Sequence, residues 1–320
     1  MIEKEFIFME HDGAIDDLLS QMLLLTMEDK EVIGINVTPA DCFIEPALES
    51  TYKILQLFKK ENIEIGRSDF NGINAFPSEW RARPEIINAL PMMINLPPSP
   101  DPYNYTEASQ LLVDKLIESI EKVSILMTGP CSNLVYALKR EPRLKEKIKK
   151  VIWMGGAFRT NGNVRAYQHN GTAEWNMYWD PKGSKELLEM NLPLTCIPLD
   201  VTNNVPVTKE FLSKLAAQSN FKISNLAGQF WALTIDTIPN YYYTYYMWDT
   251  LATSYLAIPE AFTVENVKAY ICERPPNAGQ TMIHTDGYEI TIATDVNKNT
   301  FYKYILDQFK SNFLPLTWAF

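Results

Sequence analysis

Four acidic residues lie within eight positions near the start of the chain: Glu10, Asp12, Asp16 and Asp17. They follow the apolar run 6–9, where a predicted strand passes into a predicted helix. Like charges this close repel one another unless a cation or firm hydrogen bonds compensate them, and hard divalent cations prefer carboxylate oxygens. Helix capping by Asp explains only the two residues of the first helical turn. The pattern therefore predicts a metal site.

Two known motifs were compared with this turn. An EF-hand loop counted from Asp12 needs glycine at its sixth position and Glu at its twelfth, where the chain has Asp17 and Leu23. The EF-hand interpretation therefore fails. An aspartyl phosphatase would carry D-x-D-G at such a strand end, and Asp12-Gly13 matches the second half of that motif. Because Glu10 replaces the nucleophilic Asp, an aspartyl-type phosphohydrolase stays only an alternative.

The elements that position this turn follow from short β-branched or aromatic runs that alternate with longer helical patterns over about the first 200 residues. Such alternation is typical of βα units around a largely parallel sheet. The predicted strands span residues 5–9, 32–37, 63–66, 123–127, 151–154 and 194–199, and the predicted helices span 16–28, 46–60, 106–120, 131–138 and 183–190. We expect an α/β fold with an open, mostly parallel (mixed) Rossmann-like sheet flanked by helices, in a single domain over 1–320.

Polar or glycine-bearing turns follow the predicted strands, at residues 10–13, 38–41, 128–130, 155–156 and 200–203. In open α/β sheets the ligand lies beyond the carboxyl ends of the strands. These turns are therefore expected to converge on one site.

Two segments depart from this alternation. Residues 77–102 contain seven prolines, which predicts a long ordered loop or lid carrying Trp80, without a regular helix or central strand. Residues 241–246 contain five tyrosines and are followed closely by Trp248. The tyrosines either pack a helix or form a mobile aromatic wall.

The composition is that of an ordered globular chain. Of the 320 residues, 46% are hydrophobic and 21% are charged, which excludes collagen-like and disordered classes. The formal net charge of −10 argues against a nucleic-acid partner, because phosphate backbones are bound by clustered Lys and Arg. The four cysteines are scattered and form no CxxC pair, so reduced thiols are expected.

Residues 1–9 lack the basic and apolar regions of a secretory signal, so we expect a cytoplasmic protein. The longest apolar run, 18–27, is interrupted by Ser20 and Gln21 and is shorter than the roughly 18 residues of a membrane span. It predicts a core helix and no membrane partner.

The acidic turn resembles the D-x-D-x-G-x-D-D opening of the calcium-dependent nucleoside hydrolases, with Glu10 in place of the first Asp and Gly13-Ala14 in place of a Pro-Gly pair. Further segments along the whole chain resemble the same family: ADCF (40–43), FPSEWR (76–81), TGPCSN (128–133), WMGGA (153–157), GNV (162–164), GTAEWN (171–176) and WD (248–249). Together these segments make the resemblance highly specific.

The resemblance implies a calcium ion, Ca2+, held by Asp12, Asp17, the backbone carbonyl of Thr128 and Asp249. Two ribose hydroxyls and a water would complete the shell, since calcium takes roughly six to eight oxygens. Asp12 would also be the general base that takes a proton from this calcium-bound water.

The resemblance also implies a ribose clamp formed by Asp16, Asn163, Glu174 and Asn176. A site that pairs each hydroxyl rejects deoxyribose, because its own polar groups would be left unpaired. The implied reaction is hydrolysis of the N-glycosidic bond of purine ribonucleosides to free base and ribose, through an oxocarbenium-like transition state. The implied partner is this small molecule, and a homodimer is expected by analogy.

Within the family the chain is most similar to the purine-preferring branch, which acts on inosine, adenosine and guanosine, because of Asp12-Gly13, Trp80 and Trp248. That branch stacks the purine between two tryptophans, and stacking favours a base protonated at N7 through cation–π attraction. The nonspecific branch has a histidine where this chain has Trp248. Asp41 matches a family residue near the base and is a candidate to position or protonate it.

Glu10 is the clearest departure from the family pattern. A side chain one methylene longer behind the metal could shift Asp12 and weaken calcium binding or slow turnover. A catalytically impaired nucleoside-binding protein is therefore a further alternative.

Overall fold

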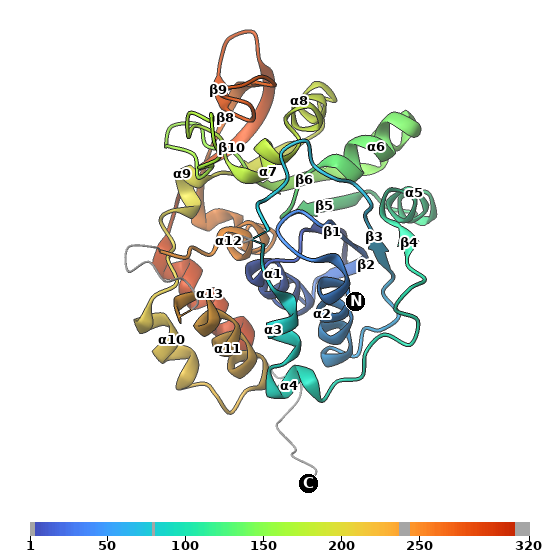
Figure 1. The fold of residues 1–320 in the computed structure, drawn as a ribbon, viewed down its shortest axis with the longest axis vertical. Helices are drawn as coiled ribbons and strands as arrows, with labels where there is room; N and C mark the ends of the chain where they lie inside the picture. The colour runs from blue at the N-terminus through green and yellow to red at the C-terminus, as the bar shows by residue number, and fades with distance from the viewer. Residues whose placement is uncertain (1–3, 79–80, 237–243, 311–320) are drawn as a thin grey trace.

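The computed structural model describes residues 4–78, 81–236 and 244–310 (Figure 1). The described residues form a ten-stranded sheet in the order β4-β3-β2-β1-β5-β6-β7-β10-β8-β9. The strands from β4 to β10 in this order are parallel, and β8 and β9 are antiparallel additions at one edge. The strands are β1 (Glu5–His11), β2 (Lys30–Val37), β3 (Ile65–Arg67), β4 (Thr106–Glu107), β5 (Val123–Met127), β6 (Ile148–Met154), β7 (Leu194–Ile197), β8 (Phe262–Ile271), β9 (Thr281–Ile283) and β10 (Tyr288–Val296).

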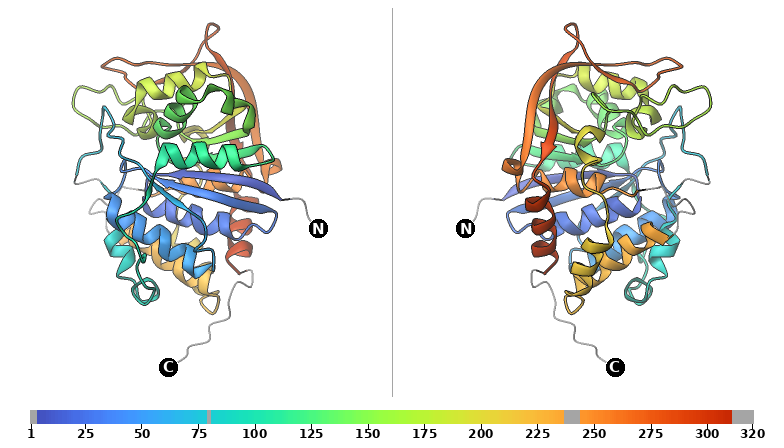
Figure 2. Two further views of the ribbon diagram at one scale, coloured as in Figure 1. Left: turned by 90° about the vertical axis from the view of Figure 1, so that its right-hand side faces the viewer. Right: turned by 90° about the vertical axis from the view of Figure 1, so that its left-hand side faces the viewer.

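Helices cover both faces of the sheet, which Figure 2 shows from the side. The α-helices are α1 (Ile15–Leu25), α2 (Ile44–Leu57), α3 (Pro84–Asn88), α4 (Pro91–Ile94), α5 (Ala108–Glu118), α6 (Ser132–Arg140), α7 (Trp175–Trp179), α8 (Pro181–Glu189), α9 (Leu199–Thr202), α10 (Lys209–Ala216), α11 (Lys222–Asp236), α12 (Trp248–Ser254) and α13 (Lys298–Lys310), and two 3-10 turns span Pro142–Lys147 and Pro259–Ala261. One core packs α1, α2 and α10–α13 on the sheet, and the other packs α5, α6 and α8 on it.

The α/β prediction with a mostly parallel, mixed sheet is confirmed. Every strand and helix predicted in the first 200 residues has a counterpart whose ends differ by at most three residues, as for 151–154 against Ile148–Met154. Strand β5 is buried along its whole length, as expected for a parallel strand covered on both faces. The apolar run 18–27 lies largely in α1, and its side chains pack in the core.

The prediction that residues 77–102 hold no regular helix was wrong. Helices α3 and α4 begin at Pro84 and Pro91, where proline is tolerated because the first helical N–H groups need no intrahelical acceptor. Asn88 in α3 donates from Nδ2 to the carbonyl of Pro46 at 3.0 Å, so α3 is tied to α2. Trp80 lies outside the described residues, so the predicted lid stays a prediction.

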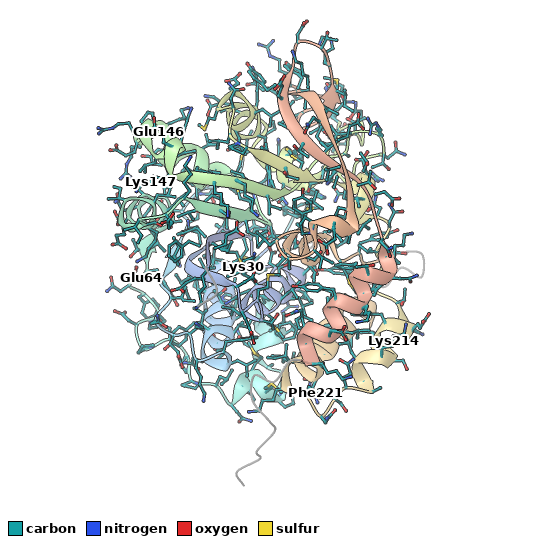
Figure 3. The ribbon with its side chains drawn as sticks, turned by 180° about the vertical axis from the view of Figure 1, so that it is seen from behind. Lys30, Glu64, Glu146, Lys147, Lys214 and Phe221 are labelled. Atoms are coloured by element: carbon teal, nitrogen blue, oxygen red, sulfur yellow. The ribbon has the colours of Figure 1, made fainter. Side chains whose placement is uncertain are left out.

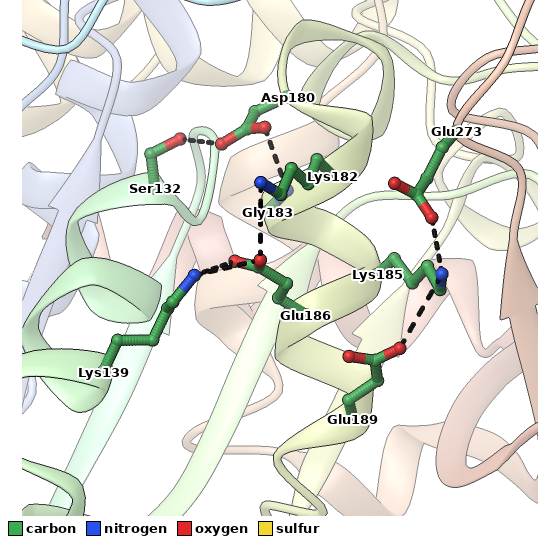
Figure 4. Close-up of polar contacts among 9 residues, drawn as sticks. All are labelled: Ser132, Lys139, Asp180, Lys182, Gly183, Lys185, Glu186, Glu189 and Glu273. Atoms are coloured by element: carbon green, nitrogen blue, oxygen red, sulfur yellow. Dashed lines mark hydrogen bonds and ion pairs between the residues drawn. The ribbon is translucent and has the colours of Figure 1, made fainter.

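Polar contacts fix α8 against its neighbours (Figure 4). Lys139 of α6 bonds Glu186 at 3.0 Å, and Ser132 donates to Asp180 at 2.6 Å. Lys185 pairs with Glu273, beyond β8. Exposed ion pairs such as those of Lys139 and Lys185 contribute little to stability singly, whereas the bond between Ser132 and Asp180 is partly buried.

The face seen from behind carries Lys30, Glu64 and Lys147, which precede or begin β2, β3 and β6 (Figure 3). These residues mark the amino ends of the parallel strands, so the carboxyl ends of the strands point away from the viewer in Figure 3. In the described part of the chain, no helix combines the length and the apolar character that a bilayer crossing requires.

Candidate active site

The turn between β1 and α1 is shaped by Gly13, which has a φ of +79°. A Cβ there would lie 2.6 Å from Sγ of Cys42, so conformation and space both require glycine. The N–H of Gly13 donates to Nδ1 of His11 at 3.1 Å, which places the histidine proton on Nε2, 3.2 Å from the Thr51 hydroxyl. Burial lowers the pKa of His11 to about 4. His11 is therefore a neutral residue that holds the turn beside Asp12.

Asp12 and Asp17 bring two carboxyl groups together at this turn. Both are buried, and the backbone N–H of Asp12 donates to Oδ1 of Asp17 at 3.4 Å. Burial, followed by the charges of Asp17 and Asp41, raises the pKa of Asp12 well above its usual range. Asp17 accepts hydrogen bonds from the N–H of Ala14 at 2.8 Å and the Thr128 hydroxyl at 2.5 Å. Hydrogen bonds therefore compensate part of the charge of Asp17, and a bound cation would compensate both carboxyls.

Asp16 and Asp249 meet where α1 packs against α12 (Figure 1). Asp16 accepts hydrogen bonds from the N–H groups of Asp249 at 2.6 Å and Thr250 at 3.1 Å, and from the Thr250 hydroxyl. Burial, followed by the charges of Asp17 and Asp16, raises the pKa of Asp249 well above its usual range. The start of α12 thus brings the carboxyl of Asp249 to those of Asp16 and Asp17 on α1.

Glu174 and Asn176 reach the same edge of the sheet from α7. Glu174 caps this helix by accepting from the N–H of Asn176 at 2.8 Å, and it also accepts from Gly156 at 3.0 Å. Burial raises the pKa of Glu174 to about 7, although these N–H groups oppose the shift. The amide nitrogen of Asn176 donates to the carbonyls of Thr128 and Met154, each at 3.0 Å. Both side chains are therefore firmly oriented.

The remaining predicted residues lie around this cluster. Asn163 is half-buried and accepts from the N–H of Trp175 at 3.1 Å, which ties its loop to α7. Asp41 is half-buried, and burial and the charge of Asp17 raise its pKa well above the usual range. The Trp248 ring contacts Tyr245, with ring centroids 4.8 Å apart. Within the described part of the chain, Oδ1 of Asp41 and the indole N–H of Trp248 are buried without hydrogen-bond partners.

Glu10 lies in a polar network that sequence analysis missed. Its two carboxylate oxygens accept from Nδ2 of Asn36 at 2.8 Å and Nδ2 of Asn133 at 2.9 Å. Burial raises the pKa of Glu10 to about 7. Asn36 could have indicated a buried polar network, because it is the polar residue in the apolar second half of β2. The contact between Asp16 and Thr250 joins residues 234 positions apart and gave no local signal.

The chemistry of the clustered carboxylates suits a hard cation. The strongest charge effects on Asp12 and Asp249 come from other carboxylates, which leaves buried negative charge to be neutralised. Carboxylate oxygens are also the ligands that calcium prefers. Among the described residues, however, no three His, Cys, Asp or Glu side chains form a group arranged to hold a metal ion. The calcium site therefore stays a prediction.

Comparison with known proteins assigns the family. A profile described as "Inosine-uridine preferring nucleoside hydrolase" matches residues 7–303, and the chain belongs to this family. The chain is 34% identical to the inosine-uridine preferring nucleoside hydrolase from Bacillus anthracis, with a TM-score of 0.88 over 96% of this chain and 99% of that one. It shares the fold of the purine-preferring ribonucleoside hydrolase from Gardnerella vaginalis, with 21% identity and a TM-score of 0.81 over 96% and 98% of the two chains.

A curated relative, uridine nucleosidase 1 of Arabidopsis thaliana, is 23% identical over 211 residues. The match covers 66% of this chain and spans 61% of that relative's length. The name of the Bacillus anthracis protein mentions inosine and uridine, that of the Gardnerella vaginalis protein mentions purines, and that of the Arabidopsis thaliana protein mentions uridine. They agree on nucleosides and differ in the base, so they leave the base preference of this chain open.

Proposed function

We propose that this protein hydrolyses the N-glycosidic bond of purine ribonucleosides to free base and ribose. The observation that carries the proposal is the cluster of buried Asp12, Asp17 and Asp249 with half-buried Asp41 at the carboxyl ends of the strands. Carboxylates placed around a ribose stabilise the positive charge that develops as the base departs. Membership of the nucleoside hydrolase family supports the same reaction.

Asp12 is proposed as the general base that accepts a proton from the water that attacks C1′. Asp12, Asp17, Asp249 and the carbonyl of Thr128 would hold a calcium ion. When bound, calcium would neutralise these carboxylates and lower the pKa of water. Asn176 supports this arrangement, because its amide nitrogen fixes the Thr128 carbonyl at 3.0 Å.

The ribose is proposed to lie between the calcium ligands and the clamp residues Asp16, Asn163, Glu174 and Asn176. The amide nitrogen of Asn176 already binds two backbone carbonyls, so its Oδ1 is the atom proposed to accept from a ribose hydroxyl. A clamp of fixed acceptors discriminates against a sugar that lacks one hydroxyl.

The purine is proposed to stack on Trp248, with Trp80 on its other face and Asp41 beside it. Among the described residues, the indole N–H of Trp248 and Oδ1 of Asp41 lack hydrogen-bond partners, which supports a ligand at this place because buried polar atoms normally have partners. We further propose a cytoplasmic homodimer whose partner is the small nucleoside, without a nucleic-acid or membrane partner.

The test is incubation of the purified protein with ribonucleosides and their 2′-deoxy forms, with calcium or with a chelator, while free base and reducing sugar are measured. We expect base and ribose from inosine or guanosine, little product from uridine, cytidine or the deoxy compounds, and loss of activity with the chelator. Phosphate release from phosphomonoesters without base release would favour an aspartyl-type phosphohydrolase. Tight inosine binding without product would favour a catalytically impaired binding protein.

A further inference from the structure

Helix α12 carries Trp248 and Asp249 but has no cap of its own. Met247, the described residue that precedes it, provides no side-chain cap. The first N–H groups of a helix need acceptors from outside the helix. Here the acceptor is Asp16 of α1, which receives the N–H groups of Asp249 at 2.6 Å and Thr250 at 3.1 Å on a single oxygen, Oδ2.

The other oxygen of Asp16 depends on Thr250. Oδ1 accepts the hydroxyl of Thr250, and Asp16 and Thr250 are both completely buried. Losing one partner of a buried polar group costs more than the bond itself contributes, because water cannot replace it. Without the hydroxyl, the Asp16 carboxylate would have to turn to find a donor for Oδ1, and Oδ2 would leave the two N–H groups of α12.

We propose that Thr250 is a positioning residue whose hydroxyl fixes the Asp16 carboxylate, and through it the start of α12 and the side chain of Asp249. This inference rests on the proposed function, since Asp249 is taken as a calcium ligand and Asp16 as part of the ribose clamp. Thr250 touches neither ligand in this scheme. Its effect is to position Asp16 and Asp249, which are proposed to contact the ribose and the calcium ion.

The same helix offers a matched control. Thr253 is also completely buried in α12, and within the described residues its hydroxyl has no hydrogen-bond partner. Thr250→Val and Thr253→Val therefore make the same chemical change in one helix, but only Thr250→Val removes a hydrogen bond, the one to Asp16. Thr250→Ser keeps the hydroxyl and removes a methyl group.

The experiment compares the wild type with Thr250→Val, Thr250→Ser and Thr253→Val in the full chain. Calcium affinity is obtained from the rise of Tm with calcium concentration. Hydrogen exchange of residues 247–254 is followed by mass spectrometry without calcium. Inosine hydrolysis gives kcat and KM.

We expect Thr250→Val to weaken calcium affinity about ten- to a hundredfold, in the range typical of residues that orient metal ligands. It should also speed exchange of the α12 amides and lower kcat. Thr250→Ser and Thr253→Val should stay within about twofold of wild type in affinity and kcat. Equal effects of the two valine variants, or failure of serine to retain the wild-type values, would overturn the positioning role.

The two proposals fail in different ways. A wild type that neither hydrolyses nucleosides nor responds to calcium overturns the proposed function, and hydrogen exchange then decides the role of Thr250. Unchanged exchange of the α12 amides in Thr250→Val overturns that role whether or not the wild type is an active hydrolase.

Discussion

Asp12 combines deep burial with close negative neighbours, and both raise its pKa. Burial and neighbouring negative charge favour the protonated form of a carboxyl, and a protonated carboxyl is no base. The proposed calcium ion would therefore both bind Asp12 and return it to the ionised form. The proposed general base would thus depend on the cation for its charge.

Asp12→Asn should lower kcat for inosine by about a hundred- to ten-thousandfold, because the amide cannot accept the proton from water. Stability in chelator should not fall, since the change removes one of several repelling carboxyls. Steady-state kinetics and urea unfolding measure the two effects. Turnover near that of the wild type would contradict the assignment of Asp12 as the base.

Glu10→Asp tests whether the departure from the family pattern impairs the enzyme. The shorter side chain cannot reach the amides of both Asn36 and Asn133, which lie on β2 and α6. Asn36 also donates to the carbonyl of Ala108 and Asn133 to the hydroxyl of Thr38, so one N–H of one amide would lose its acceptor. A buried donor left without an acceptor costs about 1–3 kcal/mol, so the free energy of unfolding should fall by about that amount in urea. Higher activity with unchanged stability would instead support the catalytically impaired alternative.

At the scale of elements, the sequence predicted what depends on local periodicity. Strand β5 and the apolar helix α1 were foreseen because burial on a sheet leaves a continuous or periodic apolar pattern. Helices α3 and α4 were missed because the proline count outweighed the position of each proline at a helix start. No strand was predicted beyond residue 199, although β8–β10 complete the sheet.

The part of the candidate site that is local in the sequence could also be predicted. Residues of the β1–α1 turn are neighbours in the chain, so their clustering is visible in the sequence. The bond between Asp16 and Thr250 and the network of Glu10 join distant segments, and only packing of the elements creates them. Sequence alone therefore located the acidic turn and left out the residues that hold it.

Gly129→Ala tests how tightly the β5–α6 turn is packed on the β1–α1 turn. A Cβ at Gly129 would lie 2.9 Å from Cβ and 3.0 Å from N of Asp12, so the two turns must move apart and the place of Asp12 relative to the turn at Gly129 must change. Since a displacement of this kind can cost on the order of a hundredfold in rate, kcat should fall strongly. The control is Gly228→Ala in α11, whose Cβ would lie 3.6 Å from Leu215 in ordinary contact. The control should keep full activity, and equal kinetics in the two variants would contradict the packing argument.

At the scale of the molecule, buried acidic groups make folding depend on pH. The pKa values of Glu10, Asp16 and Glu174 are raised by burial to about 7, above their usual values of 4.5, 3.8 and 4.5. The native state therefore holds protons that the unfolded chain releases, and this contribution to stability is lost as pH rises toward 7. His11 acts in the opposite direction, since its pKa falls from 6.5 to about 4.

In chelator, the free energy of unfolding should therefore fall between pH 5 and pH 7, because three raised carboxyls outweigh one histidine. Urea unfolding at pH 5, 6 and 7 measures this slope, to which each such group adds at most about 1.4 kcal/mol per pH unit. Glu174→Gln should flatten the curve, whereas Glu289→Gln at an exposed position should not. Calcium should stabilise the protein more at pH 7 than at pH 5, because it binds ionised carboxylates in competition with protons. Stability that rises from pH 5 to pH 7 in chelator would mean that these carboxyls are ionised in the native state without any cation.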